Sequence, residues 1–278
     1  MAETHADPRS AGRSLAIAVA QFAPTADHAA NLTAIRDLAT QAVERGAQLV
    51  VFPEYSSFFT PELGAHSVAA AQALDGEFVH GLKIIAKVLG VHIVAGMMET
   101  TADPMKLSNT LVAVDEHGTV VAIYRKLHLY DAFGQRESDW VVAGAIEPPQ
   151  TFVIDDITVA LQTCYDIRFP EVTRRLADAG ADLVLLPSEW VRGPLKEQHW
   201  RTLVTARAIE NTVYFAAAGH APPIGVGNSM IVDPMGVELA TIGESRGLAL
   251  AWISAARVAE VRQVNPALGL RRFAVLPV

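Results

Sequence analysis

Ile157-Thr-Val-Ala-Leu-Gln-Thr163 is followed at once by Cys164-Tyr-Asp-Ile-Arg-Phe-Pro-Glu171, and this stretch decides the fold of the chain. The first seven residues are apolar and β-branched, which predicts a buried strand, and a helical pattern starts at Val172. Cys164 stands where the strand ends and the helix has not yet begun. A thiol at this position lies at the mouth of a sheet, near donors that can stabilise a thiolate.

Strands and helices alternate along the rest of the chain. Apolar, β-branched runs predict further strands at 15–21, 48–52, 91–97, 109–115, 120–126, 151–154, 183–187, 213–218, 229–232 and 248–253. One-sided apolar patterns predict helices at 31–45, 78–89, 172–179 and 196–210. Turn sequences at 115–118 and 233–236 predict hairpins. The periodicity therefore predicts an α/β fold with mixed sheets.

Length and composition predict one large folded unit. The chain has 278 residues, of which 51% are hydrophobic, and no Pro/Gly/Ser-rich linker divides it. We therefore expect a single domain over residues 14–278, with a C-terminal tail from about residue 265. Residues 1–13 are polar and lack the apolar segment of a signal peptide, so we expect them to form a disordered extension.

Charge and cysteine content argue against several classes of protein. The net charge is -8, and no basic cluster is dense enough to predict a nucleic-acid interface. No apolar run reaches the length of a membrane span. The single cysteine permits no intrachain disulfide, so the fold does not require an oxidising compartment and we expect a cytoplasmic protein. The His, Asp and Glu positions show no metal-binding spacing.

Two other predicted strands end in charged side chains. Val50-Val-Phe-Pro-Glu54 ends in a carboxylate, and Val120-Val-Ala-Ile-Tyr-Arg-Lys126 ends in a lysine. With Cys164, these strand ends present a base, a cation and a nucleophile, which together suit covalent catalysis. Each residue alone has a simpler interpretation: a small buried side chain for Cys164, a surface loop acid for Glu54 and a solvated strand end for Lys126.

Three segments resemble the catalytic segments of the nitrilase superfamily, the carbon–nitrogen hydrolases with a Glu-Lys-Cys triad. They are Phe-Pro-Glu54-Tyr, Tyr-Arg-Lys126-Leu-His-Leu-Tyr-Asp and Gln-Thr-Cys164-Tyr-Asp-Ile-Arg-Phe-Pro-Glu, in the family's order. The last two are most similar to the ω-amidase-like branch. The resemblance spans residues 15 to 253 approximately and implies a four-layer α-β-β-α sandwich of two mixed sheets, usually paired into a dimer through one helical layer.

The resemblance also implies roles for four residues. Cys164 would attack the carbonyl or nitrile carbon, and Glu54 would take the thiol proton, pass one to the departing ammonia and later activate water. Lys126 would stay cationic, orient Glu54, favour the thiolate and stabilise the oxyanion together with the backbone N–H that follows Cys164. Glu137, in the loop after the lysine strand, would hold Lys126 and help to position the substrate.

Tyr165, Arg168, Glu189 and Trp190 are the candidates for substrate contacts. Arg168 would either pair with an acid and brace its loop, which is the favoured interpretation, or clamp a substrate carboxylate. Glu189 stands where the family commonly has a small residue, and it would either recognise a substrate amine or point outward in an ion pair. Trp190 would form an apolar wall of the pocket. We expect His128 to support the site structurally and not to act as a base.

These observations predict an enzyme without metal or cofactor that hydrolyses a small-molecule amide and releases ammonia. A nitrilase or an N-carbamoyl amidohydrolase is the alternative within the superfamily, and a catalytically silent binding scaffold is the alternative outside it. The partners expected are the amide or nitrile substrate and a second copy of the chain in a homodimer or larger homo-oligomer, with no nucleic acid and no membrane. The helices at 172–179 and 196–210 and the tail would form the contacts, using Val172, Leu176, Leu203, Val204 and Ile209.

Overall fold

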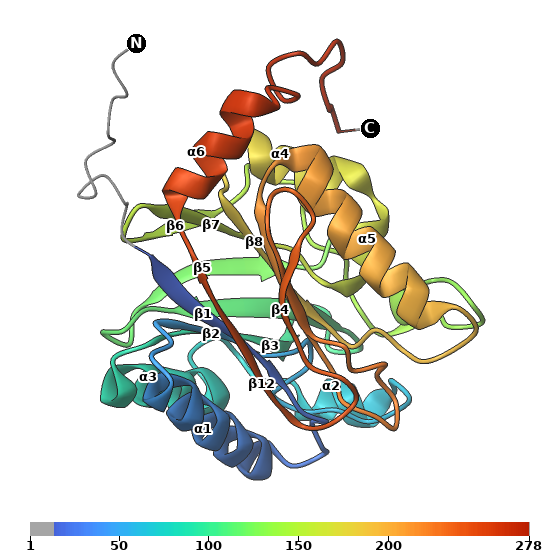
Figure 1. Cartoon of the computed structure of the whole chain (residues 1–278). Helices are drawn as coiled ribbons and strands as arrows, with labels where there is room; N and C mark the ends of the chain where they lie inside the picture. The colour runs from blue at the N-terminus through green and yellow to red at the C-terminus, as the bar shows by residue number, and fades with distance from the viewer. Residues whose placement is uncertain (1–13, 278) are drawn as a thin grey trace, which may run out of the picture.

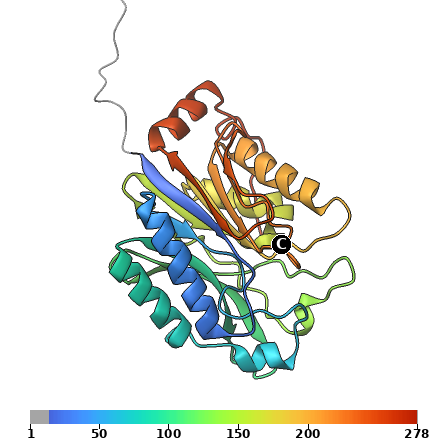
Figure 2. The same ribbon diagram turned by 60° about the horizontal axis from the view of Figure 1, so that its bottom comes forward.

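Two six-stranded sheets lie face to face between layers of helices in the computed structural model of the chain (Figure 1). The structure describes residues 14–277, so the predicted N-terminal extension over residues 1–13 lies outside the described residues. In the rotated view of Figure 2, helices α1 (His28–Glu44) and α3 (Glu77–Leu89) lie on one side of the paired sheets and helix α5 (Lys196–Asn211) on the other. The predicted four-layer α-β-β-α sandwich of mixed sheets is confirmed.

The first sheet has the strand order β12-β1-β2-β3-β4-β5. The neighbours β1, β2 and β3 run parallel, and the remaining pairs are antiparallel. Its outer face is covered by the helices α1 (His28–Glu44) and α3 (Glu77–Leu89), and the short helix α2 (Ala65–Ala70) lies near the end of β3. The strands are β1 (Leu15–Gln21), β2 (Leu49–Val51), β3 (His92–Thr100), β4 (Leu107–Val114), β5 (Val120–Arg125) and β12 (Gly247–Ile253).

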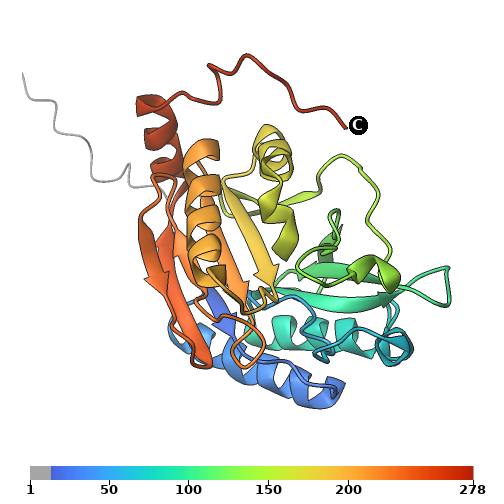
Figure 3. The same ribbon diagram turned by 90° about the vertical axis from the view of Figure 1, so that its right-hand side faces the viewer.

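The second sheet has the order β11-β10-β9-β8-β7-β6, with β7, β8 and β9 parallel. Figure 3 shows helices α4 (Pro170–Asp178) and α5 (Lys196–Asn211) over its outer face. Helix α6 (Ala255–Val264) follows β12, and residues 265–277 continue beyond it as a tail without helix or strand. The strands are β6 (Thr151–Ile154), β7 (Ile157–Leu161), β8 (Leu183–Ser188), β9 (Tyr214–Gly219), β10 (Met230–Val232) and β11 (Glu238–Thr241).

Successive side chains along a strand point alternately into the core between the two sheets and into the core between a sheet and its helices. In β1, Ile17 and Val19 pack into the core between the two sheets, whereas Ala18 and Ala20 face the helices α1 and α3. Strand β7 does the same in the second sheet, since its residue Val159 faces the inter-sheet core. This period of two is the expected pattern for a strand that is covered on both faces.

The apolar residues predicted to be available for subunit contacts are mostly used inside the subunit. Val172, Leu176 and Val204 are buried, and Leu203 packs against the same core as Val204. Ile209 is exposed, at 44%. The prediction that these five side chains remain free for a partner is therefore wrong for Val172, Leu176 and Val204, and Leu203 is half-buried. No helix between residues 14 and 277 is long and apolar enough to cross a bilayer.

Candidate active site

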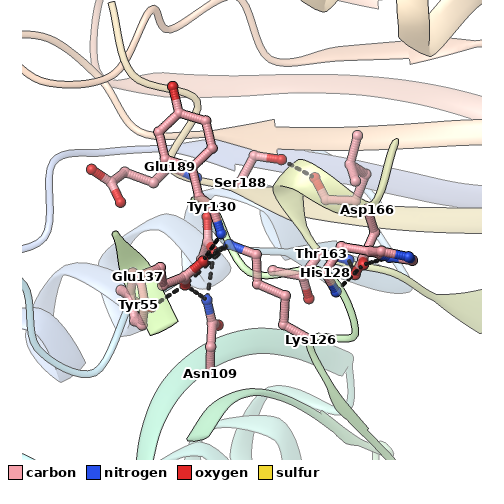
Figure 4. Close-up of polar contacts among 12 residues, drawn as sticks. Tyr55, Asn109, Lys126, His128, Tyr130, Glu137, Thr163, Asp166, Ser188 and Glu189 are labelled. Atoms are coloured by element: carbon pink, nitrogen blue, oxygen red, sulfur yellow. Dashed lines mark hydrogen bonds and ion pairs between the residues drawn. The ribbon is translucent and has the colours of Figure 1, made fainter. Parts of the chain in front are cut away.

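One cavity of about 480 Å³ contains the four residues predicted to carry out catalysis. Glu54 follows strand β2, Lys126 follows β5 and Cys164 follows β7, while Glu137 starts the short 3-10 helix η2 (Glu137–Asp139). The first sheet thus supplies the acid and the cation, and the second sheet supplies the thiol. Figure 4 shows the polar contacts that surround Lys126 and Glu137.

Glu54 is held by backbone contacts that only a glycine permits. The N–H of Gly96 in strand β3 donates to the carbonyl of Pro53 at 3.1 Å, and a Cβ on Gly96 would lie 2.6 Å from the backbone nitrogen of Tyr55. Tyr55 itself has a φ of 53°, a left-handed conformation that turns the chain sharply after Glu54. His220 Nε2 donates to the carbonyl of Glu54 at 2.6 Å, so the imidazole carries its proton on this nitrogen.

The Glu54 carboxylate receives three hydrogen bonds in a buried position. Its Oε1 accepts from Lys126 Nζ at 2.9 Å and from Asn109 Nδ2 at 2.6 Å, and its Oε2 accepts from the backbone N–H of Glu189 at 2.7 Å. Burial alone would raise the pKa of Glu54, but the Lys126 charge and these hydrogen bonds lower it below its usual value. Glu54 is therefore ionised at neutral pH and able to accept a proton.

Lys126 lies between two buried carboxylates. Its Nζ is 2.9 Å from Glu54 Oε1 and 2.9 Å from Glu137 Oε2. Glu137 is fixed in turn by the hydroxyl of Tyr55, which donates at 2.7 Å, and by the backbone N–H of Tyr130, which donates at 2.6 Å. Burial opposes the charge of Lys126, but Glu137 and Glu54 raise its pKa well above the usual value. Lys126 is a permanent cation in this site.

Asn109 is a residue of the site that the sequence analysis missed. It lies on strand β4, is 1% exposed, and its Nδ2 donates to Oε1 of both Glu54, at 2.6 Å, and Glu137, at 3.1 Å. Lys126 alone cannot neutralise two carboxylates, and the amide of Asn109 supplies a further donor between them. The only signal in the sequence was a polar residue at the start of a buried strand.

Cys164 occupies a strained turn. It begins the 3-10 helix η3 (Cys164–Arg168) with a φ of 43°, in the left-handed region that non-glycine residues seldom adopt. Asp166 holds this turn, because its carboxylate accepts from the N–H of Thr163 at 3.2 Å, from the hydroxyl of Tyr124 at 2.7 Å and from the N–H of His128 at 2.9 Å. His128 supports Asp166, which agrees with its predicted structural role.

The Cys164 thiol is protonated in the resting site. Burial raises the pKa of Cys164 well above its usual value, the charge of Glu54 raises it further, and Lys126 opposes them only in part. The charge of Lys126 acts in the predicted direction, toward the thiolate, but it does not outweigh burial and the charge of Glu54. Nucleophilic attack must therefore be coupled to the transfer of the thiol proton to Glu54.

The four predicted substrate contacts separate into two groups. Glu189 and Trp190 line the cavity, whereas Tyr165 and Arg168 are not among its lining residues. Between residues 14 and 277 the guanidinium of Arg168 has no carboxylate partner, so the favoured prediction of an acid brace is wrong. It lies instead over the Trp190 ring, 4.9 Å from the centroid, and Nη2 is 3.4 Å from His199 Nδ1.

The Glu189 side chain faces the cavity without a partner. It is half-buried, and within the described part of the chain its carboxyl group makes no hydrogen bond or ion pair, so the outward ion pair is wrong. Burial, followed by the charge of Glu54, raises the pKa of Glu189 to about 8. At neutral pH this carboxyl group is mostly neutral. Figure 4 shows it directed away from the contact between Lys126 and Glu137.

The cavity wall contains two further residues that the sequence analysis did not single out, Tyr130 and Lys196. Lys196 Nζ donates to the Tyr130 hydroxyl at 2.7 Å. No group of three or more His, Cys, Asp or Glu residues in the described ranges could hold a metal ion.

Comparison with known proteins agrees with this geometry. The family model for the carbon-nitrogen hydrolase matches residues 16–263. Deaminated glutathione amidase of Escherichia coli O157:H7 is 39% identical over 264 residues, which cover 93% of this chain and 97% of that protein. Deaminated glutathione amidase of Rattus norvegicus is 34% identical over 273 residues, covering 92% and 82% of the two chains.

Solved structures give the same assignment. The C. elegans NitFhit protein superimposes with a TM-score of 0.85 at 30% identity, covering 95% of this chain and 67% of that chain. A Nesterenkonia amidase from the nitrilase superfamily superimposes with a TM-score of 0.78 at 30% identity, covering 94% and 95%. A variant of that amidase shows covalent addition of the acetamide moiety of fluoroacetamide at the active site cysteine. This chain belongs to the carbon–nitrogen hydrolase family of the nitrilase superfamily and is an amidase-type hydrolase.

Proposed function

We propose that the chain hydrolyses a small-molecule amide through a thioester on Cys164, with Glu54 as the base, Lys126 as the electrostatic stabiliser and Glu137 as the residue that positions Lys126. The observation that carries the proposal is the pairing of an ionised Glu54 with a protonated Cys164 in one cavity. A base with a lowered pKa beside a thiol with a raised pKa supports transfer of the proton during attack, when the sulfur bonds to carbon.

The first half of the reaction forms the thioester. Sulfur attacks the amide carbon while the thiol proton passes to Glu54, and the carbonyl oxygen takes up the negative charge. Lys126 and the backbone N–H of Tyr165, in the first turn of η3, would stabilise that oxyanion. The carbon–nitrogen bond then breaks, and the proton held by Glu54 passes to the leaving nitrogen, which departs as ammonia or an amine.

The second half releases the acid. Glu54, again ionised, takes a proton from water, and the resulting hydroxide attacks the thioester carbon. The carbon–sulfur bond breaks, the acid leaves, and the proton returns to Cys164. Glu54 thus accepts and donates a proton in each half of the reaction. Its three hydrogen bonds to Lys126, Asn109 and the Glu189 N–H support this role, because they keep the carboxylate in one place while its charge changes.

We infer that deaminated glutathione is the first substrate to test. Two relatives that match nearly the whole chain carry the name deaminated glutathione amidase, and the E. coli protein is 39% identical over 93% of this chain. Mass spectrometry should detect hydrolysis of its amide by the wild type and an acyl adduct on Cys164 during turnover. Cys164→Ala and Cys164→Ser should fold normally and be inactive. An Ala variant that turns over near the wild-type rate would overturn the mechanism.

We further propose a homodimer in the cytoplasm. The tail supports a dimer, since Leu270, Phe273 and Leu276 are each more than two-thirds exposed, and Arg271 anchors it to Asp178 of helix α4 at 3.0 Å. An apolar tail of this kind is typical of a segment that packs on another subunit. Light scattering should give twice the monomer mass, and Phe273→Ser should shift the equilibrium toward the monomer. A wild-type monomer at micromolar concentration would contradict the proposal.

A further inference from the structure

Lys196 is a buried cation in the cavity wall that no acid neutralises. It is 5% exposed, and within residues 14–277 no carboxylate lies within ion-pair distance of its Nζ. The ammonium is surrounded instead by aromatic rings, with centroids at 4.1 Å for Phe133, 4.9 Å for Tyr130 and 5.6 Å for Trp190. Aromatic faces offset only part of the cost of burying a charge.

A second cation lies against the same rings. The guanidinium of Arg168 is 4.9 Å from the Trp190 centroid and 5.6 Å from that of Phe133. Its Nε is buried and has no hydrogen-bond partner among the described residues. The two cations repel each other, since burial and then the Arg168 charge lower the pKa of Lys196. Lys196 and Arg168 therefore place two positive charges beside these rings without an ion pair to a carboxylate among the described residues.

This positive charge lies beside the reacting centre and is separate from the catalytic ion pairs. Lys196 and Cys164 line the same cavity, and negative charge on Cys164 would raise the pKa of Lys196, so the two groups are close enough to interact. The carboxylates of Glu54 and Glu137 are both taken by Lys126. A molecule bound over Cys164 would therefore meet one cation already neutralised, Lys126, and one still available, Lys196.

We infer that Lys196 is a specificity-determining residue that binds a carboxylate on the substrate, with Arg168 adding positive charge from behind the aromatic rings. The inference rests on the proposed amide hydrolysis and names the substrate class as amides that carry an anionic group. A carboxylate would accept a charge-assisted hydrogen bond from Lys196 Nζ, which now contacts only the Tyr130 hydroxyl. The neutral state of Glu189 at neutral pH is compatible with an anionic substrate in the same cavity.

The alternative is a structural role, in which Lys196 only braces Tyr130 and Phe133. The two roles predict different kinetics. A brace would affect every amide equally, whereas a carboxylate ligand would affect only substrates that carry the charge, and would act mainly through KM. Succinamate and butyramide provide the comparison, because both are primary amides with a four-carbon chain and only succinamate carries a carboxylate.

The test compares Lys196→Met and Lys196→Arg with Lys87→Met, an exposed lysine on helix α3, as the control. Lys196→Met should lower kcat/KM for succinamate by about 10- to 100-fold, the effect expected of one hydrogen bond to a charged group, and change that for butyramide by less than about threefold. Lys196→Arg should retain most of the preference. An equal loss on both amides, or no loss on either, would overturn the inference.

A binding measurement separates this inference from the proposed function. Titration calorimetry on Cys164→Ala should detect succinamate binding, and adding Lys196→Met should abolish it while the circular dichroism spectrum stays unchanged. If the wild type hydrolyses neither of these amides nor deaminated glutathione, the proposed function is in error. If it hydrolyses both and Lys196→Met leaves succinamate kinetics and binding unchanged, only the role of Lys196 is refuted.

Discussion

Replacing Lys126 by Met tests the electrostatic design of the site. Methionine keeps much of the side-chain volume, but it removes the charge that lies 2.9 Å from both Glu54 and Glu137. Removing one oxyanion donor typically raises the barrier by about 2.7–4 kcal/mol, so kcat should fall about 100- to 1,000-fold. The variant should also be less stable, because two carboxylates that are 1% and 6% exposed lose their common counter-ion. Breaking a buried ion pair typically costs about 3–5 kcal/mol.

The stability loss should depend on pH in a defined direction. In the wild type the pKa of Glu54 is lowered, so its contribution is present above the unfolded-state pKa and is lost as the pH falls. In Lys126→Met the burial of Glu54 is no longer opposed by the cation, so the pKa of Glu54 should rise and the variant should lose stability as the pH rises. The difference between the two proteins should therefore be largest in mildly alkaline buffer and smallest in acid.

Urea unfolding across this pH range and steady-state kinetics on one amide provide the measurements. Lys106→Met is the control, because Lys106 Nζ contacts the carbonyl of Ser138 at 2.8 Å, near the same helix η2, but has no carboxylate partner in the described ranges. The reasoning would be refuted if Lys126→Met kept more than about a tenth of the wild-type kcat. It would also be refuted if the stability difference were the same in acid and in alkali.

Two further changes test individual pKa shifts. Glu189 has a pKa of about 8, so its carboxyl group ionises as the pH rises through that value and should then repel an anionic amide. The kcat/KM of the wild type for succinamate should therefore fall with rising pH relative to that of Glu189→Gln. Parallel pH profiles for the two proteins would contradict this. Burial lowers the pKa of His220 to about 4, so on acidification this imidazole is protonated in the unfolded chain before it is protonated in the folded protein. The free energy of unfolding should therefore fall by up to about 3 kcal/mol as the pH drops from the unfolded-state pKa to the folded-state pKa. His220→Gln retains a donor without titrating, so urea unfolding should show a shallower loss in acid; an unchanged slope would count against this assignment.

The sequence predicts the regular part of the fold well because burial imposes a period on the chain. Strand β1 was predicted with the bounds that the structure has, Leu15–Gln21, and the hairpin turns join β4 to β5 and β10 to β11 as expected. Strand β11 and helix α6 were missed. The residues of β11 are mostly exposed and do not alternate, and α6 buries only Val258 and Val261, so neither shows a clear period.

Within the site, the residues of the three catalytic motifs could be predicted from the sequence. The residues that contact them from distant parts of the chain could not. Glu54, Lys126 and Cys164 stand at strand ends, and both the local sequence pattern and the family resemblance indicate them as catalytic residues. Asn109 acts through contacts with residues 55 and 28 positions away, and Lys196 meets Tyr130 across 66 positions. Such contacts exist only after the sheets have paired. Arg168 was assigned to an acid because Phe133 and Trp190, two of the rings that lie against it, are distant along the chain.

Because β1 pairs with β12, the first sheet cannot be completed until nearly the whole chain has been synthesised. Strand β1 begins at Leu15 and lies between β2 and β12, but β12 is formed by Gly247–Ile253, more than two hundred residues later. Until the ribosome has released that segment, β1, whose residues are all buried in the folded protein, is an unpaired edge that can recruit other strands. A nascent chain that already contains Glu54, Lys126 and Cys164 is therefore still unprotected against aggregation, and holding β1 until the last strand arrives is a natural task for a chaperone.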